Sequence, residues 1–387
     1  MIKPDLYQHV QKAASLLATE LESARKRQKK LEIALDKVFP IKLYKKLRPD
    51  VTDALGENRN SIIEHFVEHG INETNLSDKT SEEHNYIAVK LSEALLKDLD
   101  IINDHGQTEE TNNIRQLNKT EGCTTKLARN EGHNFALNHT SFHLKSNTVC
   151  TWIPKNGCSS IRYTIANANG AIKSIKDIEW IHDNNDCFNA NTKEILQAEY
   201  TFVILRNPFK RLLSFFLDKL CYPNKNTSDK SNLHAQSVFK FNSCSSYNDF
   251  INFIWENPDT LYSDEHTMPQ NNFMIYRNYD NYFALENFHE AEKTIKDKIG
   301  LELIDVRDDN TIFTTKGCEP CQEITYATKA SEIQAFLAQK KVPIPEKMYS
   351  NEMLKKVATL YLQDIILYRN KIKAGDVELQ YWIQRSI

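Results

Sequence analysis

The sequence predicts an α/β fold for the C-terminal part of the chain, with a helical extension on its N-terminal side. Residues 148–153 and 200–205 each form a short, β-rich apolar run, and a polar turn and an amphipathic helical pattern follow each run. A continuous apolar run of this kind is typical of a buried strand in a parallel sheet. The chain has 387 residues, which corresponds to two or three domains at roughly 150 residues each.

Composition and charge narrow the range of functions. Hydrophobic residues make up 40% of the chain, which excludes wholesale disorder. The 49 lysines and arginines are balanced by 52 acidic residues, so we expect no nucleic-acid partner. No apolar run approaches the roughly 18 residues that span a bilayer, and the N-terminus has no signal-peptide core. The sequence therefore predicts a cytoplasmic protein without a membrane span.

Three parts follow one another along the chain. Residues 1–74 predict a helical region, and the apolar spacing within 5–39 fits a long surface helix or a short coiled coil that would join copies of the chain into a homo-oligomer. Residues 75–146 are polar and predict a connector. Residues 147–387 contain both strand–turn–helix units, so we expect the chemistry there.

The first unit predicts an anion site. Residues 154–158, Pro-Lys-Asn-Gly-Cys, form the turn, and Ser159 or Ser160 is expected to cap the helix that follows. Gly157 lets the backbone approach an anion closely, and the positive end of the helix dipole points at the same spot. Lys155 precedes the glycine, so the turn is not a Walker A motif, which places lysine at the helix start. The alternative is an ordinary junction with an exposed lysine.

The second unit places an arginine at a strand end. Arg206 follows the apolar run 200–205, Asn207 is a good N-cap, and Pro208 is a good first helical residue. Open α/β sheets bind ligands at the carboxyl ends of their strands, and Ser214 lies two helical turns further on. The alternative is a core βα unit whose arginine merely meets solvent.

Together the two segments carry a family resemblance. PKNGCSSxR and LRNPFxRLLSFFxDK resemble the two cofactor signatures of PAPS-dependent sulfotransferases, in particular carbohydrate sulfotransferases of the chondroitin 4-O type (sulfotransferase family 2). The resemblance implies a three-layer sandwich around a parallel sheet with a P-loop-like cofactor turn. It also implies transfer of a sulfuryl group from PAPS to a hydroxyl of a saccharide or polysaccharide, leaving 3′-phosphoadenosine 5′-phosphate. Because no anchoring helix is visible, a bacterial enzyme is expected.

The resemblance also implies site residues. In this family the first loop holds the 5′-phosphosulfate, and the strand-end arginine with the helical serine holds the 3′-phosphate. Carried over, the first set is Lys155, Asn156, Gly157, Cys158 (through its backbone alone), Ser159, Ser160 and Arg162, and the second set is Arg206 and Ser214.

Weaker similarity extends over residues 147–370. Asp264-Glu265-His266 resembles the family's D/N-E-H-W block, with Thr267 in place of tryptophan, and residues 279–286 resemble its Y-D-x-x-G-x-x-E segment, with Phe283 in place of glycine. Residues 39–74 also resemble a helical module of bacterial polysaccharide-biosynthesis proteins, through Arg48-Pro49-Asp50-Val51 and the segment 65–70.

Sulfuryl transfer to a hydroxyl needs a general base and stabilisation of the leaving oxygen. Lys155 suits the second task, and no metal is required. Histidine is the natural base, and we expect His182 first and His266 second. The remaining candidates are Glu179, Asp183 and Glu265.

Two other functions and one motif stay open. A kinase-like phosphoryl transferase would need an acidic residue at a strand end, where this chain has Arg206. A non-catalytic interaction protein would depend on the N-terminal helices. Cys318 and Cys321 form a lone CxxC pair, which allows two free thiols, a disulfide or a metal site.

Overall fold

A computed structural model describes residues 49–56, 58, 61–62, 115–118, 126–184, 186–221, 230–307, 315–372 and 377–386. The chain divides into two compact units, residues 1–108 and residues 109–386. In the first unit, helix α3 spans Pro49–Leu55 and buries Val51. The coiled coil expected within 5–39, with the homo-oligomer it would form, lies outside the described residues, as does most of the expected connector.

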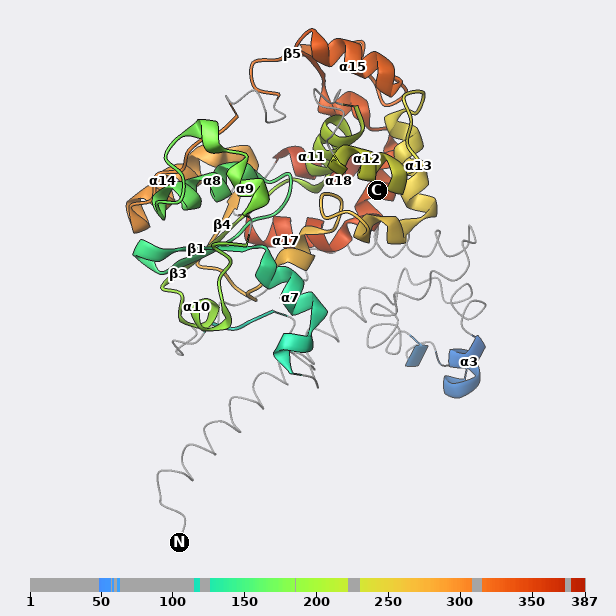
Figure 1. The fold of residues 1–387 in the computed structure, drawn as a ribbon. Helices are drawn as coiled ribbons and strands as arrows, with labels where there is room; N and C mark the ends of the chain where they lie inside the picture. Colours follow the sequence, from blue (N-terminus) through green and yellow to red (C-terminus); the bar gives the residue numbers. More distant parts are fainter. Residues whose placement is uncertain are drawn as a thin grey trace. The chain divides into compact units, whose positions relative to one another are not determined.

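The second unit mixes helices with short strands (Figure 1). Its strands are β1 (Thr140–His143), β2 (Thr148–Thr151), β3 (Tyr200–Leu205), β4 (Asn281–Ala284), β5 (Glu319–Cys321) and β6 (Lys341–Pro343). Its helices are α7 (Glu131–Asn138), α8 (Cys158–Ala168), α9 (Trp180–Asp183), α10 (Thr192–Gln197), α11 (Pro208–Phe215), α12 (Lys230–Val238), α13 (Tyr247–Glu256), α14 (Phe288–Ile299), α15 (Ala330–Ala338), α16 (Asn351–Leu360), α17 (Leu362–Lys371) and α18 (Val377–Ser386).

The main sheet has the order β1-β2-β3-β4. The pairs β2–β3 and β3–β4 are parallel, as the apolar runs predict, with Val149 opposite Thr201 and Val203 opposite Tyr282. Strand β1 is antiparallel to β2, with Thr140 opposite Thr151. The fold is therefore α/β with a partly parallel sheet. Strands β5 and β6 form a separate parallel pair.

Strand β1 and helix α7 precede residue 147, where the sequence predicts the end of a polar connector. The segment TSFH of β1 is too short and too polar to stand out as a strand, yet Thr140 is fully buried. Its hydroxyl donates to the carbonyl of Leu137 at 2.7 Å and accepts from the amide of Ala190 at 3.0 Å. These bonds satisfy the buried polar group and fix the antiparallel edge of the sheet.

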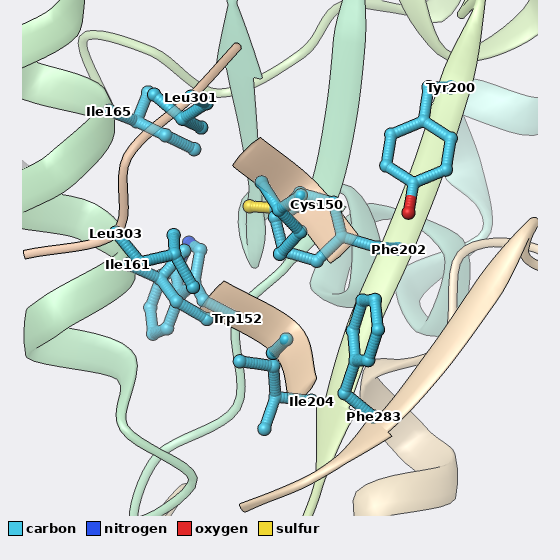
Figure 2. Packing of buried hydrophobic residues seen from close by; sticks show 12 residues of the cluster. Cys150, Trp152, Ile161, Ile165, Tyr200, Phe202, Ile204, Phe283, Leu301 and Leu303 are labelled. Carbon is cyan, nitrogen blue, oxygen red and sulfur yellow. The ribbon is translucent and has the colours of Figure 1, made fainter. Parts of the chain in front are cut away.

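One face of the sheet packs against α8 and α14. Alternate strand residues, such as Cys150 and Trp152 or Phe202 and Ile204, point to the same side because side chains alternate along a strand (Figure 2). They meet Ile161 of α8, and Ala291 and Ile295 of α14 complete the cluster. This packing holds the N-terminus of α8 at the carboxyl end of β2, where the first candidate turn lies.

The helix starts follow the sequence in one case and depart from it in the other. Asn207 caps α11, its side chain accepting from the amide of Phe209 at 3.1 Å, and Pro208 is the first helical residue, as expected. The expectation that a serine caps α8 is wrong. Gly157 occupies the cap with φ +76°, and both serines lie inside the helix. Of the predicted apolar face of α8, Ile161 and Ile165 are buried, whereas Ala168 is exposed.

The remaining helices surround the segment that follows β3. Helix α11 continues into a π-helix, Phe216–Cys221, and α12, α13 and α18 gather beside them (Figure 1). The apolar stripe that the sequence predicts after Pro208 is buried there, and it consists of Leu212, Leu213, Phe216 and Leu220. Within the described ranges, no helix combines the length and apolar character that crossing a bilayer requires.

Candidate functional site

The turn after β2 leaves the sheet in an unusual backbone conformation. Lys155 has φ +69° and Gly157 has φ +76°, with the amide of Asn156 donating to the carbonyl of Ile153 at 3.0 Å between them. Left-handed values are rare for a residue with a Cβ, so the conformation of Lys155 is imposed by its surroundings. A Cβ at position 157 would lie 3.1 Å from Cδ1 of Leu285. Only glycine fits there without moving a neighbour.

The two predicted strand ends meet at this turn. Arg206 Nη1 donates to the carbonyl oxygen of Lys155 at 2.7 Å. Burial lowers the pKa of Arg206 to about 10, and the carboxylate of Glu286 opposes that shift. The guanidinium therefore remains a cation at neutral pH. The lysine and the arginine follow the ends of β2 and β3, which are adjacent in the sheet.

Gln270 hydrogen-bonds to residues at both of these strand ends. Its Oε1 accepts from the amide of Arg206 at 3.0 Å and from Asn156 Nδ2 at 2.6 Å, and its Nε2 donates to the carbonyl of Arg206 at 2.9 Å. Both Gln270 and Asn156 are buried. Asn156 Oδ1 has no hydrogen-bond partner among the described residues. The sequence assigned no role to Gln270, because its contacts depend on a loop 64 residues downstream of Arg206.

Lys155 lies in an ion pair that the sequence did not assign. Its Nζ is 2.7 Å from Oδ2 of Asp218, and Nζ of Lys219 is 3.7 Å from the same oxygen. All three side chains are at most 16% exposed. Burial lowers the pKa of Lys155, and the charge of Asp218 opposes that shift. Burial would raise the pKa of Asp218, but the two ammonium groups hold it below its usual value.

The π-helix explains why Asp218 and Lys219 both reach the turn. In an α-helix, residues four apart share a face, and a π-turn shifts this spacing to five. Ser214 on α11 is four residues before Asp218 and five before Lys219. The α-helical spacing already places Asp218 on the face that carries Ser214, and the change to π spacing at Phe216 brings Lys219 toward the same face.

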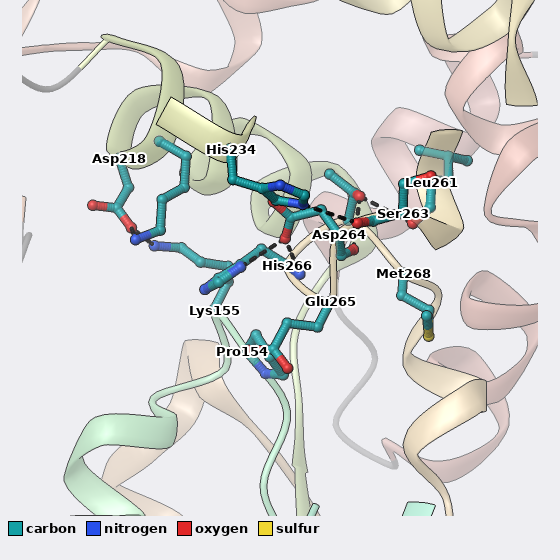
Figure 3. A network of polar contacts seen from close by, with 12 residues as sticks. Pro154, Lys155, Asp218, His234, Leu261, Ser263, Asp264, Glu265, His266 and Met268 are labelled. Atoms are coloured by element: carbon teal, nitrogen blue, oxygen red, sulfur yellow. Dashed lines mark hydrogen bonds and ion pairs between the residues drawn. The ribbon is translucent and has the colours of Figure 1, made fainter. Parts of the chain in front are cut away.

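His266 lies beside this ion pair, oriented by a carboxylate. Its Nδ1 and its backbone amide both contact Oδ1 of Asp264 at 2.8 Å, and Asp264 is 7% exposed. Burial would raise the pKa of Asp264, but the hydrogen bond from His266 holds it below its usual value. Figure 3 shows Lys155, Asp218, Asp264 and His266 within one network of polar contacts. Positive charge on His266 also lowers the pKa of Asp218.

His182 lies on the exposed side of the short helix α9. Partial desolvation lowers its pKa, and the positive charges of Arg162 and Lys219 lower it further. Arg162 contacts α9 and the end of β2: its Nη2 donates to the carbonyl of Ile181, and its guanidinium lies 4.7 Å from the centre of the Trp152 ring. Arg162 thus connects α8 to the helix that carries His182.

The other predicted residues differ in what they contact. Ser159 and Ser214 are half-buried, and neither hydroxyl has a hydrogen-bond partner among the described residues. Ser160 is buried, and its Oγ accepts from the amide of Val306 at 3.3 Å. Cys158 is half-buried at the first position of α8. Ser159 and Ser214 therefore have hydroxyls available to a ligand, while Ser160 also holds a loop.

The remaining candidate carboxylates are arranged around the two histidines. Glu179 and Asp183 are exposed on either side of His182. Glu265 Oε2 lies 3.2 Å from His139 Nε2. The hydrogen bond from His139 lowers the pKa of Glu265. Glu265 is therefore a paired carboxylate with a reduced capacity to accept a proton.

Arg211 connects the lysine turn, residues 154–158, to the histidine segment, residues 264–268. This buried side chain donates to the carbonyl of Pro154 at 3.0 Å and to that of Met268 at 2.8 Å. A longer contact of 3.4 Å reaches the carbonyl of Glu265. The motif LRNPFxRLLSFFxDK contains Arg211, Asp218 and Lys219, so the sequence held the signal for these residues without revealing their contacts.

The cysteines that the structure describes supply no second site. Cys318 and Cys321 are both free, so the disulfide alternative for the CxxC pair does not apply in this structure. Across the part of the chain that the structure describes, no group of three or more candidate ligands gathers around a point that could hold a metal. The histidine pair at 65 and 69 lies outside the described residues.

Comparison with known proteins adds one match. A model of the Sulfotransferase family matches residues 138–369. The match covers more than half of the chain and includes β1 to β4, the lysine turn and the histidine segment. No curated protein and no solved structure is significantly similar to the chain.

Proposed function

The chain belongs to the sulfotransferase family, and we propose that it transfers the sulfuryl group of PAPS to a hydroxyl of a saccharide acceptor. Family membership supports sulfuryl transfer in general. The donor, the class of acceptor and the roles of individual residues are parts of the proposal. The resemblance to chondroitin 4-O enzymes supports the saccharide.

The observation that carries the proposal is the hydrogen bond from Arg206 to the carbonyl of Lys155. It joins the two segments that would bind opposite ends of the donor. A donor with a phosphosulfate at one end and a 3′-phosphate at the other needs cationic groups in two places. Lys155 would serve the first end, and Arg206 with Ser214 the second.

The residues present fit such a donor. The turn has two left-handed residues, Lys155 and Gly157, and a turn of this kind can present backbone N–H groups to an anion. The hydroxyls of Ser159 and Ser214 have no other partner among the described residues. Lys155, Lys219 and Asp218 together carry one net positive charge, which favours an anionic ligand.

Two groups of this chain would carry the chemistry. PAPS, when bound, supplies an activated sulfuryl group. The Lys155 ammonium would stabilise the negative charge that develops on the leaving oxygen. A histidine would accept the proton of the acceptor hydroxyl.

Of the two histidines, we propose His266 as the base. Asp264 holds its Nδ1, which leaves Nε2 to accept a proton, and a fixed tautomer is what a general base requires. His182 has no comparable orienting contact among the described residues, although its lowered pKa keeps it neutral and able to accept a proton. His182 is thus the competing candidate.

Sulfur-35-labelled PAPS and a panel of oligosaccharides test the proposal. The full chain should transfer label to at least one oligosaccharide, and Lys155→Ala should lower the rate of that transfer by about 10²- to 10³-fold. A thermal-shift comparison of PAPS with ATP separates the kinase alternative, because only PAPS should raise the melting temperature. Transfer to no acceptor, together with stabilisation by ATP alone, would overturn the proposal.

A further inference from the structure

Lys155 must be protonated to stabilise a negatively charged leaving oxygen, but its burial in the fold disfavours the protonated form. The side chain is 11% exposed, and burial favours the neutral amine. A neutral amine would give little stabilisation to a developing negative charge. Something in the protein must therefore keep the proton on Lys155 before the donor arrives.

We infer that Asp218 is the counter-ion that keeps Lys155 protonated and fixes the position of its ammonium group in the turn. The inference rests on the proposed function only in assigning Lys155 to the leaving oxygen. The contact between Nζ and Oδ2 is 2.7 Å, and Asp218 comes from the π-helix, 63 residues away in sequence. Asp218 acts through Lys155, so it is a positioning residue.

The charged groups around the pair support this assignment. Lys155 also faces the positive charges of Lys219 and Arg206, which both disfavour its protonation, so Asp218 is the anion that opposes them. Asp218 in turn faces the ammonium groups of Lys155 and Lys219, whose positive charges keep it ionised. A buried carboxylate with two ammonium neighbours stays charged without neutralising the site, because one positive charge remains.

The geometry also keeps the pair accessible to a ligand. Asp218 is 16% exposed and Lys155 11%, so both side chains keep a small contact with solvent. An anionic ligand can replace Asp218 as the partner of the Lys155 ammonium, while Lys219 stays paired with Asp218. The second lysine therefore removes the penalty of leaving Asp218 buried and unpaired.

Competitive labelling of the full chain tests the inference without any transfer assay. Acetic anhydride modifies only deprotonated amines, and peptide mass spectrometry then gives the pH at which Lys155 is half deprotonated. Asp218→Asn should lower this midpoint by at least about one pH unit, which makes Lys155 roughly tenfold more reactive at a fixed pH below the midpoint. The matched control Asp186→Asn, at an exposed carboxylate, should leave it unchanged. An unchanged midpoint in Asp218→Asn overturns the inference.

Asp218→Glu covers the case in which Asp218→Asn does not fold. It keeps the negative charge, so the Lys155 midpoint should stay within about half a pH unit of the wild type. A fall of a full unit would contradict the inference. In a transfer assay, the alkaline limb of the kcat profile should move to lower pH in Asp218→Asn and return in Asp218→Glu. A labelling shift without transfer by the wild type would reject the proposed function alone, and transfer without a labelling shift would reject this inference alone.

Discussion

The guanidinium of Arg206 holds the carbonyl oxygen of Lys155 at 2.7 Å, although the two residues are 51 positions apart in the sequence. The bond fixes the backbone of the lysine turn to the end of the neighbouring strand. Gln270 strengthens the same junction by binding both the main chain of Arg206 and the side chain of Asn156. The site is therefore built on adjacent strand ends, which a rigid sheet keeps in register.

Removal of the Lys155 ammonium should slow transfer far more than it weakens donor binding. We expect Lys155→Ala to lower the single-turnover rate by about 10²- to 10³-fold, the range found when one charge-stabilising donor is removed. Rapid-quench measurement with labelled donor at saturating concentration checks this. A rate within about threefold of the wild type would remove Lys155 from the reaction.

Substitution of the two histidines should have different effects in the same single-turnover assay. His266→Ala should lower the rate by about 10²- to 10⁴-fold and flatten the acid limb of the pH profile, whereas His182→Ala should keep that limb. The reverse pattern would identify His182 as the base. Its lowered pKa would then place the limb below about 6.5.

Gly157 should tolerate no side chain. Ala has to adopt φ +76° there, at about 1–2 kcal/mol, and its Cβ would also press on Leu285. Gly170 is a matched control, with φ +85° and no atom within 4 Å of its Cβ position. Urea unfolding should show both alanine variants destabilised, with Gly157→Ala the worse and alone in losing donor binding. Equal losses for the two variants would show that the contact with Leu285 is unimportant.

Lys155 should make stability depend on pH in the alkaline range. Its pKa is lowered in the folded protein, so the unfolded chain binds more protons between that value and about 10.4. The free energy of unfolding should therefore rise with pH across this window, relative to Lys155→Met. Urea unfolding at about pH 8 and about pH 10 checks the sign. Identical slopes for the wild type and Lys155→Met would contradict the lowered pKa.

The sequence predicted the parts of the site that depend on local patterns. The run 200–205 matches β3 residue for residue, and Asn207 caps the helix after it, because a continuous apolar run and a polar cap are local signals. The cap of α8 was misassigned, since serine is a common cap but the positive φ needed here favours Gly157. The sequence did not predict strand β1, because its residues are polar and become buried only through the fold.

Partners that are distant in sequence were beyond prediction. The pairing of Lys155 with Asp218 joins residues 63 positions apart in the sequence, and no apolar pattern reveals it. The pairing of Asp264 with His266 is local, and the sequence named the block without its hydrogen bond. The sequence therefore identified the reacting side chains better than the groups that orient them.

The central claim is that Lys155 and Arg206 bind one doubly anionic adenosine ligand, and calorimetric titration of the full chain with 3′-phosphoadenosine 5′-phosphate tests it most directly. We expect saturable binding to one site. Arg206→Ala should weaken that binding by roughly 10- to 100-fold, because hydrogen bonds to charged groups contribute about 1.5–3 kcal/mol. Arg129→Ala, at an exposed arginine, should bind like the wild type. Absence of binding, or equal affinity in Arg206→Ala and the wild type, would contradict the account.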